Sequence, residues 1–236
     1  MNPTPSPDAE SRPTLSILLP AYNEAAGIAR VVAGALRVAR AGDEVLVVDD
    51  GSTDDTAREA HRAGARVVRI ERNGGKGLAV RRGLREAHGE VIVLLDADEQ
   101  DDPSEIPLLL EALTPGVDMV IGSRFLGTFE SGAITRLNRI GTVGLTAVMN
   151  RLYGTHITDP IAGFRAVRAD VARAVPLRAA RYDIEMDLLL GLLNADRRVV
   201  EVGVRRASRR HGATSLSPLF DGTRILATIV RRWLER

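Results

Sequence analysis

Two aspartates, Asp96 and Asp98, directly follow the apolar run VIVLL at 91–95. A spacing of two lets both side chains emerge on one side at the end of a strand. Neighbouring carboxylates repel each other unless a cation lies between them, and Mg²⁺ or Mn²⁺ accepts oxygen ligands while leaving positions open for substrate phosphates. Gln100, two residues further on, offers a neutral oxygen. We therefore predict a site for Mg²⁺ or Mn²⁺ at Asp96, Asp98 and Gln100.

Helix capping is the competing explanation for the acidic turns of this chain. Asp101 and Asp102 are well placed to cap the helix that follows them. Asp49 and Asp50 end another apolar run, and Gly51 permits a tight turn after them. Part of this second cluster serves as a cap, whereas Asp50 is also placed to accept hydrogen bonds from a nucleobase or ribose. The residues alone leave both interpretations open.

Lys76 is the only lysine in the chain, because the other 31 of the 32 basic residues are arginine. It lies in NGGKG at 73–77, just before a stretch with a helical pattern. Glycines let a ligand approach the backbone, and a helix N-terminus favours anions. A lysine ammonium is a compact charge, whereas arginine presents a broad fork. We predict that Lys76 faces a bound ligand; the alternative is a lone surface lysine.

Arginines form a second group of candidate ligand contacts. Arg124 ends the strand that carries GSRF, and a basic cluster occurs late in the chain at Arg205, Arg206, Arg209, Arg210 and His211. Arginine pairs well with phosphate oxygens through bidentate contacts. A solvated basic face is the alternative interpretation of the late cluster.

The elements that must position these side chains alternate along the first half of the chain. Short apolar runs predict strands at 15–20, 45–50, 66–70, 91–98 and 119–125, with amphipathic helices beginning near residues 24, 53, 76 and 105. This alternation indicates right-handed βαβ units and a mostly parallel sheet with helices on both faces. Ligands bind at the carboxyl ends of such strands, and four of these strands end in polar clusters.

The second half has an α+β pattern that we place on the same sheet. It predicts a helix at 134–154, a strand at 164–168, a helix at 183–196, a strand at 199–207 and a helix from 217. We divide the chain into a disordered tail at 1–13, an α/β domain at 14–216 and a C-terminal amphipathic helix at 217–236. In that helix Ile225, Ile229 and Trp233 form an apolar stripe flanked by arginines, which is typical of helices that lie on anionic bilayers. Packing on its own domain or on a second subunit, as in a homodimer, is the alternative.

Composition excludes several classes of function. A net charge of +1 and an aromatic content of 3% argue against a nucleic-acid partner. The chain has no cysteine, which excludes disulfides and fits a cytoplasmic protein. No apolar run approaches the roughly 20 residues that a membrane span requires. The absence of GxGxxG after the first strand argues against a dinucleotide oxidoreductase.

Eight motifs together resemble those of family-2 glycosyltransferases with the GT-A fold. They are LPAYNE, VVDDGSTD, NGGKG, LLDADEQDDP, GSRF, TDPIAGFR, YDIEMDLL and RRHGATSL, and they extend from about residue 15 to 221. The similarity is greatest to dolichol-phosphate mannosyltransferases and bacterial polyprenyl-phosphate glycosyltransferases. It implies metal-dependent, inverting transfer of a hexose from a GDP-mannose or UDP-glucose type of donor to a polyprenyl phosphate. Such an enzyme would work in the cytoplasm, at the membrane surface.

The resemblance also implies roles for particular residues. It implies nucleotide-sugar contacts by Pro20, Ala21, Tyr22, Glu24, Asp50, Lys76, Asp96, Ala97, Arg124, Arg205 and Arg209. It implies metal binding by Asp96, Asp98 and Gln100, and catalytic roles for Asp98, Arg124 and Asp159. A sugar-hydroxyl acceptor would need a base, for which Asp159, Asp183 and Glu185 are candidates. Two positions depart from the family pattern: Ser215 replaces a common lysine, and Glu99 is acidic where many members are apolar or glycine.

Three other functions compete with this interpretation. The first is a soluble glycosyltransferase that acts on a sugar or on a small phosphorylated acceptor such as a glycerate. The second is a nucleotidyltransferase, which would require a glycine-rich basic loop after the first strand, where this chain has PAYNE. The third is a non-catalytic sugar-nucleotide-binding protein, against which the intact DADEQ argues.

Overall fold

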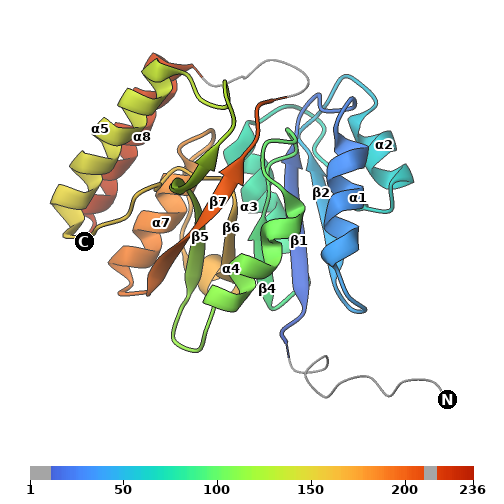
Figure 1. Cartoon of the computed structure of the whole chain (residues 1–236), viewed down its shortest axis with the longest axis horizontal. Coiled ribbons are helices and arrows are strands. Elements are labelled where there is room, and N and C mark those ends of the chain that lie inside the picture. The colour runs from blue at the N-terminus through green and yellow to red at the C-terminus, as the bar shows by residue number, and fades with distance from the viewer. Residues whose placement is uncertain (1–11, 210–216) are drawn as a thin grey trace.

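The computed structural model describes residues 12–209 and 217–236. Nearly all of the tail expected at 1–13, and also Arg210, His211 and Ser215, lie outside these residues. Within them, seven strands form one sheet in the order β3-β2-β1-β4-β6-β5-β7 (Figure 1). The strands are β1 (Leu15–Ala21), β2 (Glu44–Asp49), β3 (Arg66–Arg69), β4 (Val91–Leu94), β5 (Met119–Phe129), β6 (Arg165–Arg168) and β7 (Val199–Arg206).

Helices cover both faces of the sheet. They are α1 (Ile28–Val38), α2 (Thr56–Arg62), α3 (Lys76–Glu86), α4 (Ile106–Ala112), α5 (Arg136–Tyr153), α6 (Ala169–Ala174), α7 (Ile184–Asn194) and α8 (Pro218–Leu234). Side chains of α1, α2 and α4 join one hydrophobic core, and those of α3, α6, α7 and α8 join the core on the opposite face. The strands are apolar towards both sides because both sides are covered.

Strand direction confirms the predicted fold class. β1 to β4 run parallel, β6 is antiparallel to both β4 and β5, and β7 pairs parallel with β5. The second half of the chain therefore completes the same sheet through one reversed strand. The carboxyl ends of β1, β2 and β4 meet at one edge, where the polar clusters follow.

Several elements differ from their predicted bounds. β4 ends at Leu94, because the acidic turn leaves the sheet before Asp96. α1 begins at Ile28 rather than near residue 24, since the Glu24 carbonyl accepts the amides of Gly27 and Ile28 in the turn ahead of the helix. β5 continues to Phe129 along β7, and α6 was not predicted.

The C-terminal helix α8 packs differently from the predicted stripe. Ile225 and Ile229 are buried in the core that α7 shares, whereas Trp233 is 42% exposed. The expectation that these three residues form one surface stripe is therefore wrong. The helix turns its Ile225 and Ile229 side inwards because that side completes the core. No helix within the described part of the chain has the length and apolar character to cross a bilayer.

Candidate active site

A cleft of about 410 Å³ opens at the carboxyl ends of β1, β2 and β4. Ten residues proposed from the sequence line it: Pro20, Ala21, Tyr22, Glu24, Asp50, Lys76, Asp96, Ala97, Asp98 and Arg209. Asn73 and Gly75 also line it and belong to the NGGKG loop that sequence analysis placed at a ligand, whereas sequence analysis assigned no ligand contact to the remaining lining residues, Asn23, Ala79, Arg181 and Tyr182. Arg124, Asp159, Gln100 and Arg205 lie outside this lining.

Hydrogen bonds between side chains and backbone amides hold the loops after β1 and β2 together. Asn23 adopts a left-handed conformation with φ of 55°, and its Oδ1 accepts the Thr53 amide at 2.9 Å. Its own amide donates to Ser52 Oγ at 2.9 Å. Gly51, with φ of 72°, lies so close to the next loop that a Cβ would fall 2.7 Å from the Asn73 amide nitrogen. The cleft wall is thus fixed by local turn geometry.

Asp50 organises the glycine loop ahead of α3. Its Oδ1 accepts the Gly74 amide at 3.0 Å and its Oδ2 accepts the Gly75 amide at 2.7 Å. Burial raises the pKa of Asp50, and the two amide donors only partly offset that effect. The carboxylate therefore joins β2 to the loop that presents Lys76, in addition to facing the cleft.

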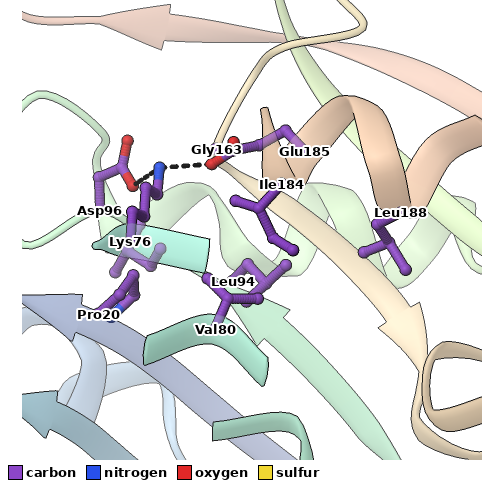
Figure 2. A pocket seen from close by; sticks show the side chains of 10 residues that line it. Pro20, Lys76, Val80, Leu94, Asp96, Gly163, Ile184, Glu185 and Leu188 are labelled. Atoms are coloured by element: carbon purple, nitrogen blue, oxygen red, sulfur yellow. Dashed lines mark ion pairs between the residues drawn. The ribbon is translucent and has the colours of Figure 1, made fainter. Parts of the chain in front are cut away.

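Lys76 bridges two carboxylates. Its Nζ lies 2.6 Å from Asp96 Oδ1 and 2.5 Å from Glu185 Oε1, as Figure 2 shows. Burial disfavours the ammonium, but the two carboxylates outweigh burial and hold the pKa of Lys76 above its ordinary value. The single lysine of the chain thus joins α3 to the end of β4 and to the first turn of α7. Glu185 is the partner that sequence analysis considered only as a base.

A small apolar pocket beneath this bridge brings side chains from both halves of the chain together. Val80, Leu94, Ile184 and Leu188 line it together with the stem of Lys76 (Figure 2). Gly163 closes the other side, where a Cβ would fall 2.6 Å from Asp96 Oδ2. The TDPIAGFR motif therefore needs glycine at this position to leave room for the Asp96 carboxylate.

Two arginines face the second aspartate. Asp98 Oδ2 lies 2.8 Å from Arg209 Nη2 and 3.7 Å from Arg206 Nη2. Arg206 also pairs with Asp101 at 2.6 Å. Burial disfavours the Arg206 guanidinium, but Asp101 and Asp98 outweigh burial and raise its pKa. Positive charge thus lies directly over the strand-end carboxylates.

Arg206, and not its neighbour Arg205, approaches Asp98, although Arg206 does not itself line the cleft. Successive residues of β7 face opposite sides of the sheet, so only one of the two can do so. Arg205 is 65% exposed at its side chain and approaches Glu130 at 3.9 Å on the outer side. Sequence analysis assigned Arg205 to the nucleotide sugar. The alternation of side chains along a strand predicts that only one of these two arginines faces Asp98, but it does not predict which one.

Arg124 and Asp159 form a buried, bidentate ion pair. Arg124 Nε and Nη2 lie 2.6 and 2.7 Å from the two carboxylate oxygens of Asp159. Burial disfavours the guanidinium, but the hydrogen bond to Asp159 raises the pKa of Arg124. Two of the three predicted catalytic residues are therefore partners of each other, outside the lining of the cleft.

The acidic residues of the cleft fit a divalent ion that shares its coordination with phosphate. Mg²⁺ commonly uses one or two carboxylates together with substrate oxygens and water. Asp96 and Asp98 supply two carboxylates, and no cluster of three or more His, Asp or Glu side chains suited to a metal occurs within the described residues. The Gln100 amide contacts Arg206 and the Ala207 carbonyl instead. The fit thus rests on Asp96 and Asp98.

Glu24 is an acidic group of the cleft whose pKa lies far from its ordinary value. Its Oε1 lies 3.3 Å from Arg209 Nη1. Burial raises the pKa of Glu24 to about 7, with Asp98 and Asp96 contributing in the same direction and Arg209 opposing them. The charge of the cleft therefore changes near neutral pH.

Comparison with known protein families gives one match over most of the chain. The model for "Glycosyl transferase family 2" matches residues 16–175. Glycosyltransferase AglJ of Haloferax volcanii is 33% identical over 97% of this chain and 73% of its own length. Dolichol-phosphate mannosyltransferase of Pyrococcus furiosus is 32% identical over 86% of this chain and 59% of its own length. Undecaprenyl-phosphate mannosyltransferase of Micrococcus luteus is 32% identical over 92% of both chains.

Solved structures are similar over nearly the whole fold. Glucosyl-3-phosphoglycerate synthase of Mycobacterium tuberculosis superposes with a TM-score of 0.76 and 28% identity, covering 95% of this chain and 81% of that one. That structure was determined with Mn²⁺, uridine diphosphate and glucosyl-3-phosphoglycerate. A second structure of the same synthase contains Mg²⁺ and uridine diphosphate, with the same TM-score and coverage.

Proposed function

Because this chain belongs to glycosyl transferase family 2, we propose that it transfers a hexose from a nucleotide sugar to a polyprenyl phosphate. The donor would be of the GDP-mannose or UDP-glucose type, and the reaction would invert the anomeric centre. The protein would work at the cytoplasmic face of a membrane, as a peripheral enzyme. The names of two relatives, dolichol-phosphate and undecaprenyl-phosphate mannosyltransferase, support this acceptor.

The observation that carries the proposal is the pairing of strand-end carboxylates with arginines in one cleft. Transfer breaks the bond between the anomeric carbon and the nucleoside diphosphate, so negative charge grows on the leaving group. Arg206 and Arg209 face Asp98, where they are placed to offset that charge. A bound Mg²⁺ or Mn²⁺, held by Asp96 and Asp98, would polarise and orient the diphosphate. Lys76 would keep Asp96 in position.

The surroundings of the candidate general bases bear on the kind of acceptor. A phosphate is already anionic near neutral pH, whereas a sugar hydroxyl needs a base to remove its proton. Each candidate is engaged elsewhere: Asp159 with Arg124, Glu185 with Lys76, and Asp183 with Thr228 Oγ1 at 3.2 Å. These contacts favour an acceptor that supplies its own negative charge.

A small phosphorylated acceptor such as phosphoglycerate is the second candidate. The similarity to glucosyl-3-phosphoglycerate synthase, which was solved with phosphoglyceric acid, supports it. Incubation with labelled donor and either extracted polyprenyl phosphate or 3-phosphoglycerate distinguishes the two. We expect label in the organic phase with the lipid acceptor. Label found only in a water-soluble phosphoglycerate product would reverse the assignment.

Donor and metal are tested by a thermal-shift panel. We expect GDP or UDP to raise the melting temperature only with Mn²⁺ or Mg²⁺, because both aspartates and the diphosphate would share the ion. Ligand at a hundred times its Kd stabilises by about 2.7 kcal/mol, which is roughly 5–10 °C for a domain of this size. Equal shifts in EDTA and in metal would contradict metal-dependent binding.

A further inference from the structure

Exposed apolar side chains gather on two helices, α5 and α8, that do not line the cleft. Of twelve large apolar side chains exposed in the described part of the chain, three belong to α5 and five to α8. These two helices lie side by side at one end of the molecule, as Figure 1 shows. Soluble monomers rarely concentrate exposed apolar residues in this way, and such a concentration usually marks a docking surface.

The exposed side of α5 is apolar in the middle and basic at both ends. Arg136, Ile140, Val143, Ala147 and Arg151 follow one another at spacings of three or four, which places them on one helix face. Ile140 is 70% exposed and Val143 is 53% exposed. The opposite face carries the buried residues of the helix, including Met149 and Tyr153, so α5 cannot simply rotate to hide Ile140.

α8 presents a similar uncharged side. Leu226, Val230, Trp233 and Leu234 are exposed, while Ile225 and Ile229 fill the core on the other side. The two helices end close together, because the Arg236 guanidinium lies 5.4 Å from the centre of the Tyr153 ring. We call the exposed residues Ile140, Val143, Val148, Leu226, Val230, Trp233 and Leu234 the α5–α8 surface.

Charge identifies what the α5–α8 surface contacts. The sequence has no acidic residue between Glu130 and Asp159, so every charged residue of α5 is an arginine. Arg136, Arg139 and Arg151 are exposed and make no ion pair with any described residue. The acid of α8, Asp221, is buried, and Glu235, which follows the helix, pairs with Arg178 at 2.5 Å. The surface therefore complements a negatively charged partner.

We propose that the α5–α8 surface docks this protein on an anionic lipid bilayer. The apolar centre enters the boundary between headgroups and acyl chains, Trp233 lies at that boundary, and the arginines contact lipid phosphates. Both helices lie along the membrane plane and neither crosses it. Docking would bring the enzyme to a polyprenyl acceptor. That purpose rests on the proposed function, whereas the exposed apolar side chains and arginines that support docking do not.

A second copy of this chain fits the surface less well. A two-fold dimer apposes the same patch on both subunits. Arg136, Arg139 and Arg151 would then meet the same arginines of the partner, and the surface supplies no acidic side chain between them. A bilayer supplies the apolar environment and the negative charge together.

Co-sedimentation with vesicles that contain no polyprenol tests the docking alone. Vesicles of phosphatidylcholine with one third phosphatidylglycerol should bind the protein, and pure phosphatidylcholine should bind at least tenfold less. Ile140→Glu/Val143→Glu and, separately, Val230→Glu/Leu234→Glu should each lower partitioning at least tenfold. Leu36→Glu/Leu108→Glu is the control, since these leucines on α1 and α4 are 39% and 43% exposed, close to Val230 at 42%. Melting temperatures establish that all variants fold.

Two further measurements complete the test. Arg136→Gln/Arg139→Gln should weaken binding to anionic vesicles only, and 1 M salt should weaken wild-type binding, because the Debye length falls from roughly 10 Å at 0.1 M to 3 Å. Equal sedimentation of wild type and all variants would overturn the proposal. So would light scattering that shows a dimer broken by the glutamate variants. Vesicle binding without transfer to any lipid acceptor would instead refute only the proposed function.

Discussion

The two halves of the molecule hold their site residues in place by different means. In β1 to β4, the loops at the cleft bind each other through backbone amides, as Asn23 does with Thr53 and Asp50 with Gly75. From β5 onwards, the corresponding positions depend on charged side chains that neutralise each other outside the lining of the cleft, above all Arg124 and Asp159. Loss of the Asp98 charge in the first half should therefore cost little stability, whereas loss of the Asp159 charge in the second half should cost much.

Asp159→Ala gives the sharpest test of that contrast, because it leaves Arg124 buried without its partner. We expect a loss of about 3–5 kcal/mol in the free energy of unfolding, as for other broken buried ion pairs. Urea denaturation measures it. Glu59→Ala, which removes the half-buried partner of the exposed Arg62, is the control and should cost less than about 1 kcal/mol.

The double variant Arg124→Met/Asp159→Leu separates stability from activity. Replacing both charges with apolar side chains of similar size should restore most of the lost stability. If transfer activity returns as well, Arg124 is structural and has no direct role in the reaction. A single Asp159→Ala that is as stable as wild type would contradict the contrast between the halves.

Asp98→Ala should affect activity far more than stability. After this change the Ala207 amide still donates to the Gln100 carbonyl and Arg206 still pairs with Asp101, so we expect a change in melting temperature of only a few degrees. Loss of one charge-stabilising group in an active site typically costs 10²–10³ in kcat, and we expect at least that. Steady-state kinetics beside circular dichroism measure both quantities. Glu111→Ala, on the exposed side of α4, serves as the control, and turnover within threefold of wild type in Asp98→Ala would refute the assignment.

Lys76→Arg tests the point where the two halves meet. The ammonium contacts Asp96 and Glu185 at 2.6 and 2.5 Å, and the broader guanidinium cannot occupy the same place without moving one of them. We expect kcat/KM to fall roughly 10- to 100-fold. Arg82→Lys, an exposed exchange on the same helix, should leave it unchanged. Kinetic constants equal to those of wild type would show that the bridge does not need lysine.

Glu24 should give the smallest effect, visible in the pH dependence of stability. Its pKa is about 7 in the folded protein against an ordinary value of 4.5, so between these values the folded state holds a proton that the unfolded state has lost. The free energy of unfolding should therefore fall as pH rises from 4.5 to 7, and Glu24 should contribute no further change above that. Glu24→Gln should flatten this slope in metal-free protein. An unchanged slope would assign it to other groups.

The sequence predicted the first half well because its positions depend on short-range rules. Apolar runs located β1, β2 and β3 within one residue at each end, and the polar clusters after β1, β2 and β4 do line one cleft. Lys76 also lines that cleft, at the first residue of α3.

The second half was harder to predict because its contacts are between residues distant in sequence. Nothing local indicates that Glu185 would reach Lys76, or that Arg206 rather than Arg205 would face Asp98. The insertion of β6 as a reversed strand between β4 and β5 is likewise set by packing of the whole sheet. The prediction of an apolar surface stripe on α8 was wrong for the same reason, since Ile225 and Ile229 complete a core built with other helices.

The bridge at Lys76 would also link the two proposed substrates thermodynamically. One ammonium is shared between Asp96, which we propose contacts the donor, and Glu185 in α7. A donor that engages Asp96 would change the charge that Lys76 offers to Glu185, and through it the affinity for an acceptor bound beside α7. Reciprocity requires the acceptor to change donor affinity by the same factor. Titrations of nucleotide with and without acceptor measure that factor. A value of one in wild type would mean that the bridge has only a structural role.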